Sequence, residues 1–100
     1  MVEVRQTERF VQWLAGLRDL KGRAKVQARI ERLIGGNPGD VKPVGAGVSE
    51  LRINYGPGYR VYYLQRGGTL IILLAGGGKS SQAKDIDEAL LLADNLTEEI

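Results

Sequence analysis

The sequence predicts a single α+β domain over residues 1–100, with a small, mainly antiparallel sheet covered by helices on one face. Two observations indicate this class: residues that alternate between apolar and polar mark short strands, and apolar residues at helical spacing mark helices. Clusters of glycine and proline separate these segments. The expected order is β-α-α-β-β-β-α, an αα-hairpin followed by a three-strand meander and a C-terminal helix.

The first half of the chain is predicted to hold one strand and two helices. Residues 2–5 alternate and form the strand, and Thr7 can cap the first helix. A second helix is expected over residues 23–34, and the glycine- and proline-rich residues 35–47 are expected to form a loop. The apolar stripe of the second helix comprises Val26, Ile30 and Leu33, and its outer face carries Lys25, Arg29 and Arg32.

The second half is predicted to hold three strands and the last helix. The strands are expected at residues 49–54, 59–66 and 69–75, and the third is apolar throughout, as in a strand buried on both faces. Ser80 or Ser81 can cap the last helix. Its inner stripe is predicted to comprise Ala83, Ile86, Leu90 and Ala93.

Two arginines are the first candidates for binding chemistry. If the helices cover the face that carries Leu51 and Val61, then Arg52, Arg60 and Tyr62 lie on an open face. The guanidinium fork suits phosphate, because it donates two hydrogen bonds to one group. The strand register, and pairing with Glu50 instead of an anion, stay open. The neighbouring tyrosines could stack nucleobases or simply be favourable strand residues.

The glycine run at residues 76–78, followed by Lys79, is a second candidate anion site. Glycines allow close backbone approach to a ligand, and a helix N-terminus attracts anions. The segment resembles a phosphate-binding P-loop, but Leu73 stands where that motif needs glycine, so nucleotide triphosphate binding is not expected. A plain strand-to-helix connection is the alternative.

Composition excludes several function classes. The chain has no cysteine and no histidine, which excludes disulfides, the usual zinc sites and histidine acid–base catalysis, and no cofactor is expected. Residues 1–79 carry 13 of the 14 basic and six of the 12 acidic residues, a net charge of +7, whereas residues 80–100 carry −5. This asymmetry favours an anionic partner. No signal peptide or membrane span is expected, and a cytoplasmic location fits.

Four segments together resemble the toxins of the RelE/ParE superfamily. These segments are Glu50-Leu51-Arg52-Ile53, Gly56-Pro57-Gly58-Tyr59-Arg60-Val61-Tyr62-Tyr63, Gly76-Gly77-Gly78-Lys79-Ser80-Ser81-Gln82 and Lys84-Asp85-Ile86. The chain is most similar to the addiction-module killer subgroup, which is HigB-like. The resemblance covers nearly the whole chain and agrees with the element order of the RelE fold.

The resemblance implies a toxin of a type II toxin–antitoxin system with a small helix-turn-helix antitoxin as its partner. It implies a metal-independent endoribonuclease (an mRNA interferase) that inhibits translation by cleaving mRNA on the ribosome through attack of the 2′-hydroxyl. The implied catalytic residues are Arg52, Arg60 and Lys79, and the implied substrate-binding residues are Lys42, Tyr62, Arg66 and Ser80. The chain would be a monomer or part of a toxin–antitoxin hetero-oligomer.

Two alternatives remain open at this point. Many RelE-type enzymes carry a C-terminal tyrosine or histidine near the cleaved bond, and neither residue follows Tyr63 here. A ParE-like inhibitor of DNA gyrase shares the implied fold and cleaves no RNA. A nucleic-acid-binding protein without catalytic activity is the other alternative.

Overall fold

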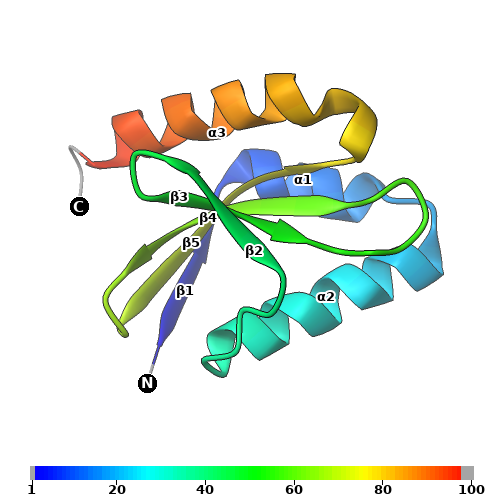
Figure 1. Ribbon diagram of the computed structural model, residues 1–100, viewed down its shortest axis with the longest axis horizontal. Coiled ribbons are helices and arrows are strands. Elements are labelled where there is room, and N and C mark those ends of the chain that lie inside the picture. Colours follow the sequence, from blue (N-terminus) through cyan, green and yellow to red (C-terminus); the bar gives the residue numbers. More distant parts are fainter. Residues whose placement is uncertain (1, 98–100) are drawn as a thin grey trace.

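The computed structural model describes residues 2–97 as an α+β fold with a five-stranded mixed sheet and three α-helices (Figure 1). The elements are β1 (Glu3–Gln6), α1 (Glu8–Gly16), α2 (Leu20–Ile34), β2 (Val41–Gly45), β3 (Val48–Arg52), β4 (Arg60–Arg66), β5 (Leu70–Gly77), the 3₁₀ turn η1 (Lys79–Ser81) and α3 (Gln82–Thr97). The strand order is β1-β5-β4-β3-β2, with β1 parallel to β5 and every other pair antiparallel. The fold class predicted from the sequence is therefore confirmed.

The helices cover both faces of the sheet, so the expectation of helices on one face was wrong. Figure 1 shows α3 on one side of the sheet and α2 on the other. Two separate apolar clusters result, one beneath α1 and α2 and one beneath α3. Ala89 and Ala93 of α3 pack in the second cluster with the ring of Tyr62. The sheet face expected to be open is thus largely buried.

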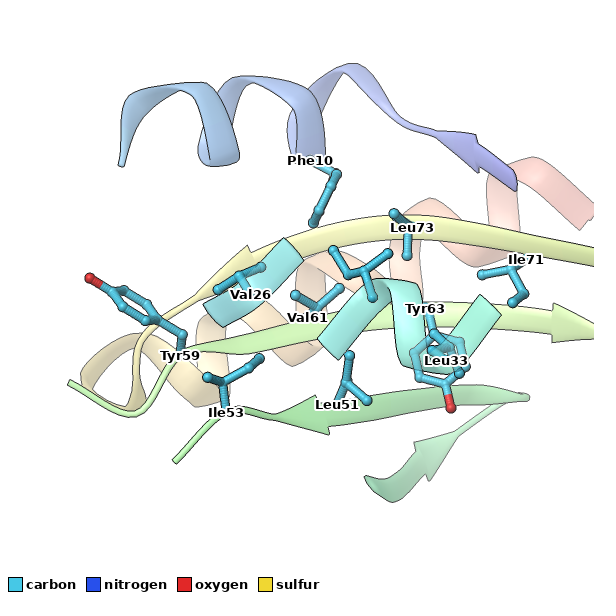
Figure 2. Close-up of a cluster of buried hydrophobic side chains, with 11 residues drawn as sticks. Phe10, Val26, Leu33, Leu51, Ile53, Tyr59, Val61, Tyr63, Ile71 and Leu73 are labelled. Atoms are coloured by element: carbon cyan, nitrogen blue, oxygen red, sulfur yellow. The ribbon is translucent and has the colours of Figure 1, made fainter. Parts of the chain in front are cut away.

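The first cluster forms the larger core (Figure 2). Phe10 from α1 and the predicted stripe of α2 pack on alternate residues of β3, β4 and β5, among them Leu51, Val61 and Leu73. Tyr59 and Ile53 lie together at one end of this cluster in Figure 2. That end of the core supports the candidate site described below.

The helix boundaries follow from two caps. The Thr7 side chain accepts a hydrogen bond from the Phe10 amide, which confirms the predicted cap of α1. Asp19 caps α2 by accepting from the Gly22 amide, so α2 begins at Leu20, three residues before the expected start. Gly22 precedes the expected start of this helix. It lies in the first turn instead, where a Cβ would come 2.6 Å from the ring of Tyr59.

The expected loop over residues 35–47 contains a strand that the sequence did not reveal. β2 pairs with β3 at the edge of the sheet, and its register is interrupted between Pro43 and Gly45. Proline in a strand favours an edge position, because it has no backbone N–H to donate to an adjacent strand. The meander therefore has four strands instead of three.

An irregularity in β5 changes which face its last residues present. Tyr62 pairs with Ala75 but Tyr63 pairs with Leu73, so Leu74 is an extra residue in the ladder. Leu74 and Ala75 consequently both pack in the cluster under α3. Such bulges are frequent next to functional sites, where they redirect a strand.

The predicted inner stripe of α3 is confirmed except at Ala83, because Ile86 and Leu90 are partly buried against the second cluster. Ala83 is exposed, Ala89 is buried, and Ala93 is buried as expected. The short turn η1 precedes the α-helix, and Ser81 Oγ donates to the Asp85 carboxylate at 2.5 Å instead of capping α3 in the expected way. Within residues 2–97, none of the helices has the length and apolar character needed to cross a membrane.

Candidate functional site

One end of the antiparallel meander gathers the three side chains that the sequence singled out for catalysis. At this end β2 and β4 begin and β3 and β5 stop, so residues distant in the chain meet. They line a shallow pocket of about 250 Å³. The lining, called the cationic pocket below, comprises Asp40, Arg52, Ile53, Asn54, Gly58, Tyr59, Arg60 and Lys79.

The strand register places Arg52 directly opposite Arg60, which settles the question that the sequence left open. The Arg52 side chain is 34% exposed and that of Arg60 is 12% exposed. Arg60 is therefore largely buried, and Arg52 is partly exposed to solvent. Two cations at neighbouring positions of a sheet repel each other unless negative charge lies close by.

Glu50 supplies that negative charge from beneath the two arginines. Its side chain is fully buried, with Oε1 3.0 Å from Arg52 Nε and Oε2 3.6 Å from Arg60 Nε. Oε2 also accepts hydrogen bonds from the Tyr62 hydroxyl at 3.1 Å and from Gln82 Nε2 at 2.9 Å. Glu50 thus links both arginines to α3. These five residues are called the Glu50 network below.

The network keeps Glu50 ionised. Burial alone would raise the pKa of the carboxyl group, but hydrogen bonds from Arg52, Gln82 and Tyr62 and the charge of Arg60 together lower it below its ordinary value. Burial raises the pKa of the Tyr62 hydroxyl, and the nearby charge of Glu50 raises it further. Tyr62 is therefore a neutral donor at physiological pH.

The arrangement leaves donors available for an anion. Arg52 Nε donates to Glu50, whereas Arg60 only forms an ion pair with it, so Arg60 Nε and Nη1 are both buried without a hydrogen-bond partner in the described structure. One carboxylate between two arginines leaves an excess positive charge at the pocket. Lys79 adds another, whereas Asp40 is the acidic residue of the lining. Such a group of cations suits a phosphate.

Lys79 reaches the pocket because two loops are tied together. Its amide donates to the carbonyl of Pro57 at 3.1 Å, which joins the start of η1 to the β3–β4 turn. Across the same contact, Gly58 has a φ of +73° and lies against the Lys79 side chain. The Lys79 side chain is exposed, so it can meet a ligand from solvent.

Two of the three glycines before Lys79 make room for the protein's own side chains. A Cβ at Gly76 would lie 2.2 Å from the ring of Trp13, and a Cβ at Gly77 would lie 1.8 Å from the Asp85 carboxylate. Adjacent residues of a strand point to opposite faces, so Gly76 meets Trp13 of α1 and Gly77 meets Asp85 of α3. The interpretation that the run allows close approach of a ligand is thus wrong for Gly76 and Gly77.

The predicted substrate-binding residues lie outside the pocket lining. Tyr62 has no exposed surface, which contradicts its expected place on an open face, because α3 covers it and its hydroxyl is bound to Glu50. Lys42 is exposed on β2 opposite Glu50 in the register. Arg66 is exposed at the far end of β4, and Ser80 is exposed beside Lys79.

Arg29 has a role that the sequence did not predict. It was expected on the outer face of α2, but it is only half-exposed and its guanidinium donates to the carbonyls of Arg52, Pro38 (2.9 Å) and Asp40 (3.3 Å). It therefore fixes the backbone of two pocket residues. Gln82, on the Glu50 network, was also missed, and only its position in a motif segment could have suggested it.

Comparison with known proteins identifies a close relative. The chain is 50% identical over 95 residues to a protein of Haemophilus influenzae described as uncharacterized, and the match spans 95% of this chain and 96% of that protein. No family model matches the chain.

Proposed function

The chain belongs to the same family as this Haemophilus influenzae protein, and we propose that it is the toxin of a type II toxin–antitoxin system. In this proposal it is an endoribonuclease that cleaves mRNA on the ribosome and so inhibits translation. The 2′-hydroxyl of one nucleotide attacks the adjacent phosphodiester, which yields a 2′,3′-cyclic phosphate and a 5′-hydroxyl. No metal ion takes part.

The cationic pocket is the observation that carries the proposal. Attack of the 2′-hydroxyl creates a pentacoordinate phosphorane with more negative charge than the starting phosphodiester. Arg52, Arg60 and Lys79 meet at one pocket that is open to solvent. Cations fixed before the reaction stabilise such a transition state without reorganising during it. The Glu50 network supplies this fixation for both arginines.

Proton transfer must proceed without histidine. The attacking 2′-hydroxyl loses a proton and the departing 5′-oxygen gains one. Asp40 is the acidic residue of the pocket lining and is exposed, so it is our candidate for the base. Lys79 is our candidate for the acid. Glu50 is unsuited to either role, because it is buried and both of its oxygens already have partners.

The proposal extends to the fold and the partners. A first strand, two helices, an antiparallel meander and a last helix support a fold of the RelE type. The partner is then a helix-turn-helix antitoxin encoded beside the toxin. The place of action is the cytoplasm, where the ribosome and mRNA are found, and the chain acts as a monomer or is held in a hetero-oligomer with the antitoxin.

Expression of the chain without its partner tests the proposal. We expect growth arrest and cuts in mRNA that are in phase with codons, as seen by mapping of 5′ ends. Growth arrest with intact transcripts would contradict endonuclease activity. A supercoiling assay with purified gyrase, run in parallel, detects a ParE-like inhibitor, and harmless overexpression of folded protein would indicate a binding protein without toxicity.

A further inference from the structure

A second hollow lies beside the cationic pocket, along α2. It has a volume of about 240 Å³ and is lined by Lys25, Ala28, Arg29, Arg32, Ile53 and Asn54. Ile53 and Asn54 also line the cationic pocket. The two hollows are therefore adjacent parts of one surface, with the end of β3 between them.

The walls of this α2 groove carry only positive charge. Lys25, Arg29 and Arg32 stand at positions i, i+4 and i+7, which lie on one face of a helix. The lining contains no acidic residue. Lys25 Nζ lies 5.4 Å from the centre of the Tyr55 ring, and among residues 2–97 no carboxylate forms an ion pair with Lys25 or Arg32. Both side chains are exposed.

Arg29 joins the groove to the proposed catalytic centre. Its guanidinium binds the carbonyl of Arg52, so the α2 groove has a fixed position relative to the cationic pocket. Its Nε is buried and has no hydrogen-bond partner in the described structure. The amide side chain of Asn54, exposed at the boundary, offers both a donor and an acceptor.

We propose that the α2 groove is a second RNA subsite, which binds backbone phosphates of the strand next to the scissile phosphate. Lys25 and Arg32 contact the phosphates, and Asn54 contacts the nucleotide between the two hollows. The inference rests on the proposed function for the identity of the strand as RNA. A single strand fits best, because it presents evenly spaced negative charges and can pass from one hollow to the next.

Binding of single-stranded RNA of increasing length tests this subsite. The probes are fluorescent oligonucleotides of three to twelve nucleotides with 2′-O-methyl groups, which cannot undergo the cleavage reaction. The test variant is Lys25→Ala/Arg32→Ala. The matched control is Arg5→Ala/Lys84→Ala, which removes the same charge from exposed positions outside both hollows. Anisotropy titrations at several salt concentrations give the affinity and its salt dependence.

We expect the test variant to bind the twelve-nucleotide RNA about tenfold more weakly than the wild type. The slope of log affinity against log salt should become shallower by about 1.4, because each phosphate contact on a single strand contributes about 0.7. The three-nucleotide probe should bind equally to both proteins. The control should change the affinity for either probe less than twofold.

Two results would overturn the inference. If the test variant and the wild type bind the twelve-nucleotide RNA with equal affinity and equal salt slope, Lys25 and Arg32 do not form an RNA subsite. Weaker binding of the antitoxin with unchanged RNA affinity would assign the groove to an acidic protein segment. The proposed function can fail independently of this inference. If the wild type binds long RNA through Lys25 and Arg32 but makes no codon-phased cuts in cells, the subsite is supported and the endonuclease activity is disproved.

Discussion

Arg52 and Arg60 are directly opposite each other in the pairing of β3 with β4. This arrangement is stable because Glu50 lies buried within ion-pair distance of both guanidinium groups. The carboxylate balances one of the two charges and restricts both side chains to one orientation. The remaining positive charge faces the cationic pocket together with Lys79. A buried acid thus positions a pair of arginines for an external anion.

Arg60→Ala should abolish the toxicity of the expressed chain. Arg60 is largely buried at the pocket, and removing one fixed donor from a site that stabilises developing charge costs about 100-fold to 1,000-fold in rate. The measurement is mRNA cleavage by 5′-end mapping together with growth. Arg60→Lys retains the charge but not the fork, so it should restore only part of the activity. Full toxicity of folded Arg60→Ala protein would exclude this site.

Glu50→Gln should lower the free energy of unfolding by about 3 kcal/mol at pH 7, because it leaves two partly buried arginines without their counter-charge. Urea unfolding monitored by circular dichroism measures the change. Glu31→Gln, at an exposed position on α2, is the matched control and should be nearly neutral. Equal effects of the two substitutions would show that the Glu50 network adds no stability.

The free energy of unfolding of the wild type should also depend on pH, because Glu50 titrates. Its pKa is lower in the folded than in the unfolded chain, so the carboxylate stabilises the fold above the ordinary value of 4.5. That contribution is lost as the pH falls through the lowered pKa. The difference in unfolding free energy between wild type and Glu50→Gln should therefore shrink between pH 6 and pH 3. A constant difference across this range would contradict the role of ionised Glu50.

The sequence predicted the α+β class and most strands, because alternation and helical spacing report directly on burial. It failed for β2 because Pro43 and the five glycines of residues 35–47 are typical of a loop. It predicted the last helix but not the sheet face that this helix covers, because Tyr62, with its polar hydroxyl, gives no sign of complete burial. Which face a terminal helix covers depends on long-range packing, and here Ala89 and Ala93 permit close approach.

The candidate site shows the same limit. Strand alternation, the glycine run and the family resemblance together selected Arg52, Arg60 and Lys79, and the structure brings all three to one pocket. Their mutual geometry depends on the register of β3 with β4, which side-chain type does not determine. The partnership of Glu50 with Gln82 joins residues 32 positions apart, and no local pattern indicates such a contact.

Lys79→Ala should lower the cleavage rate at saturating RNA by about tenfold to 100-fold, because a general acid typically contributes about 100-fold to 10,000-fold and water can replace it in part. Lys84→Ala, an exposed change of the same type outside the pocket, is the control and should leave the rate unchanged. The loss at Lys79 should shrink for an RNA with a 5′-phosphorothiolate at the cleaved bond, since sulfur leaves without protonation. An unchanged loss with that substrate would restrict Lys79 to phosphate binding.

Gly77→Ala should destabilise the fold by about 2 kcal/mol, because the new methyl group would overlap the Asp85 carboxylate. Gly68→Ala is the matched control: no atom lies within 4 Å of its Cβ position, so its effect should stay within about 0.5 kcal/mol. In an Asp85→Ala background the same Gly77→Ala change should cost at least 1 kcal/mol less, about the coupling expected of residues in contact. Chemical unfolding of the four proteins gives this coupling. If Gly77→Ala lowers the free energy of unfolding equally in both backgrounds, glycine is needed at this position for the backbone conformation and not to make room for the Asp85 carboxylate.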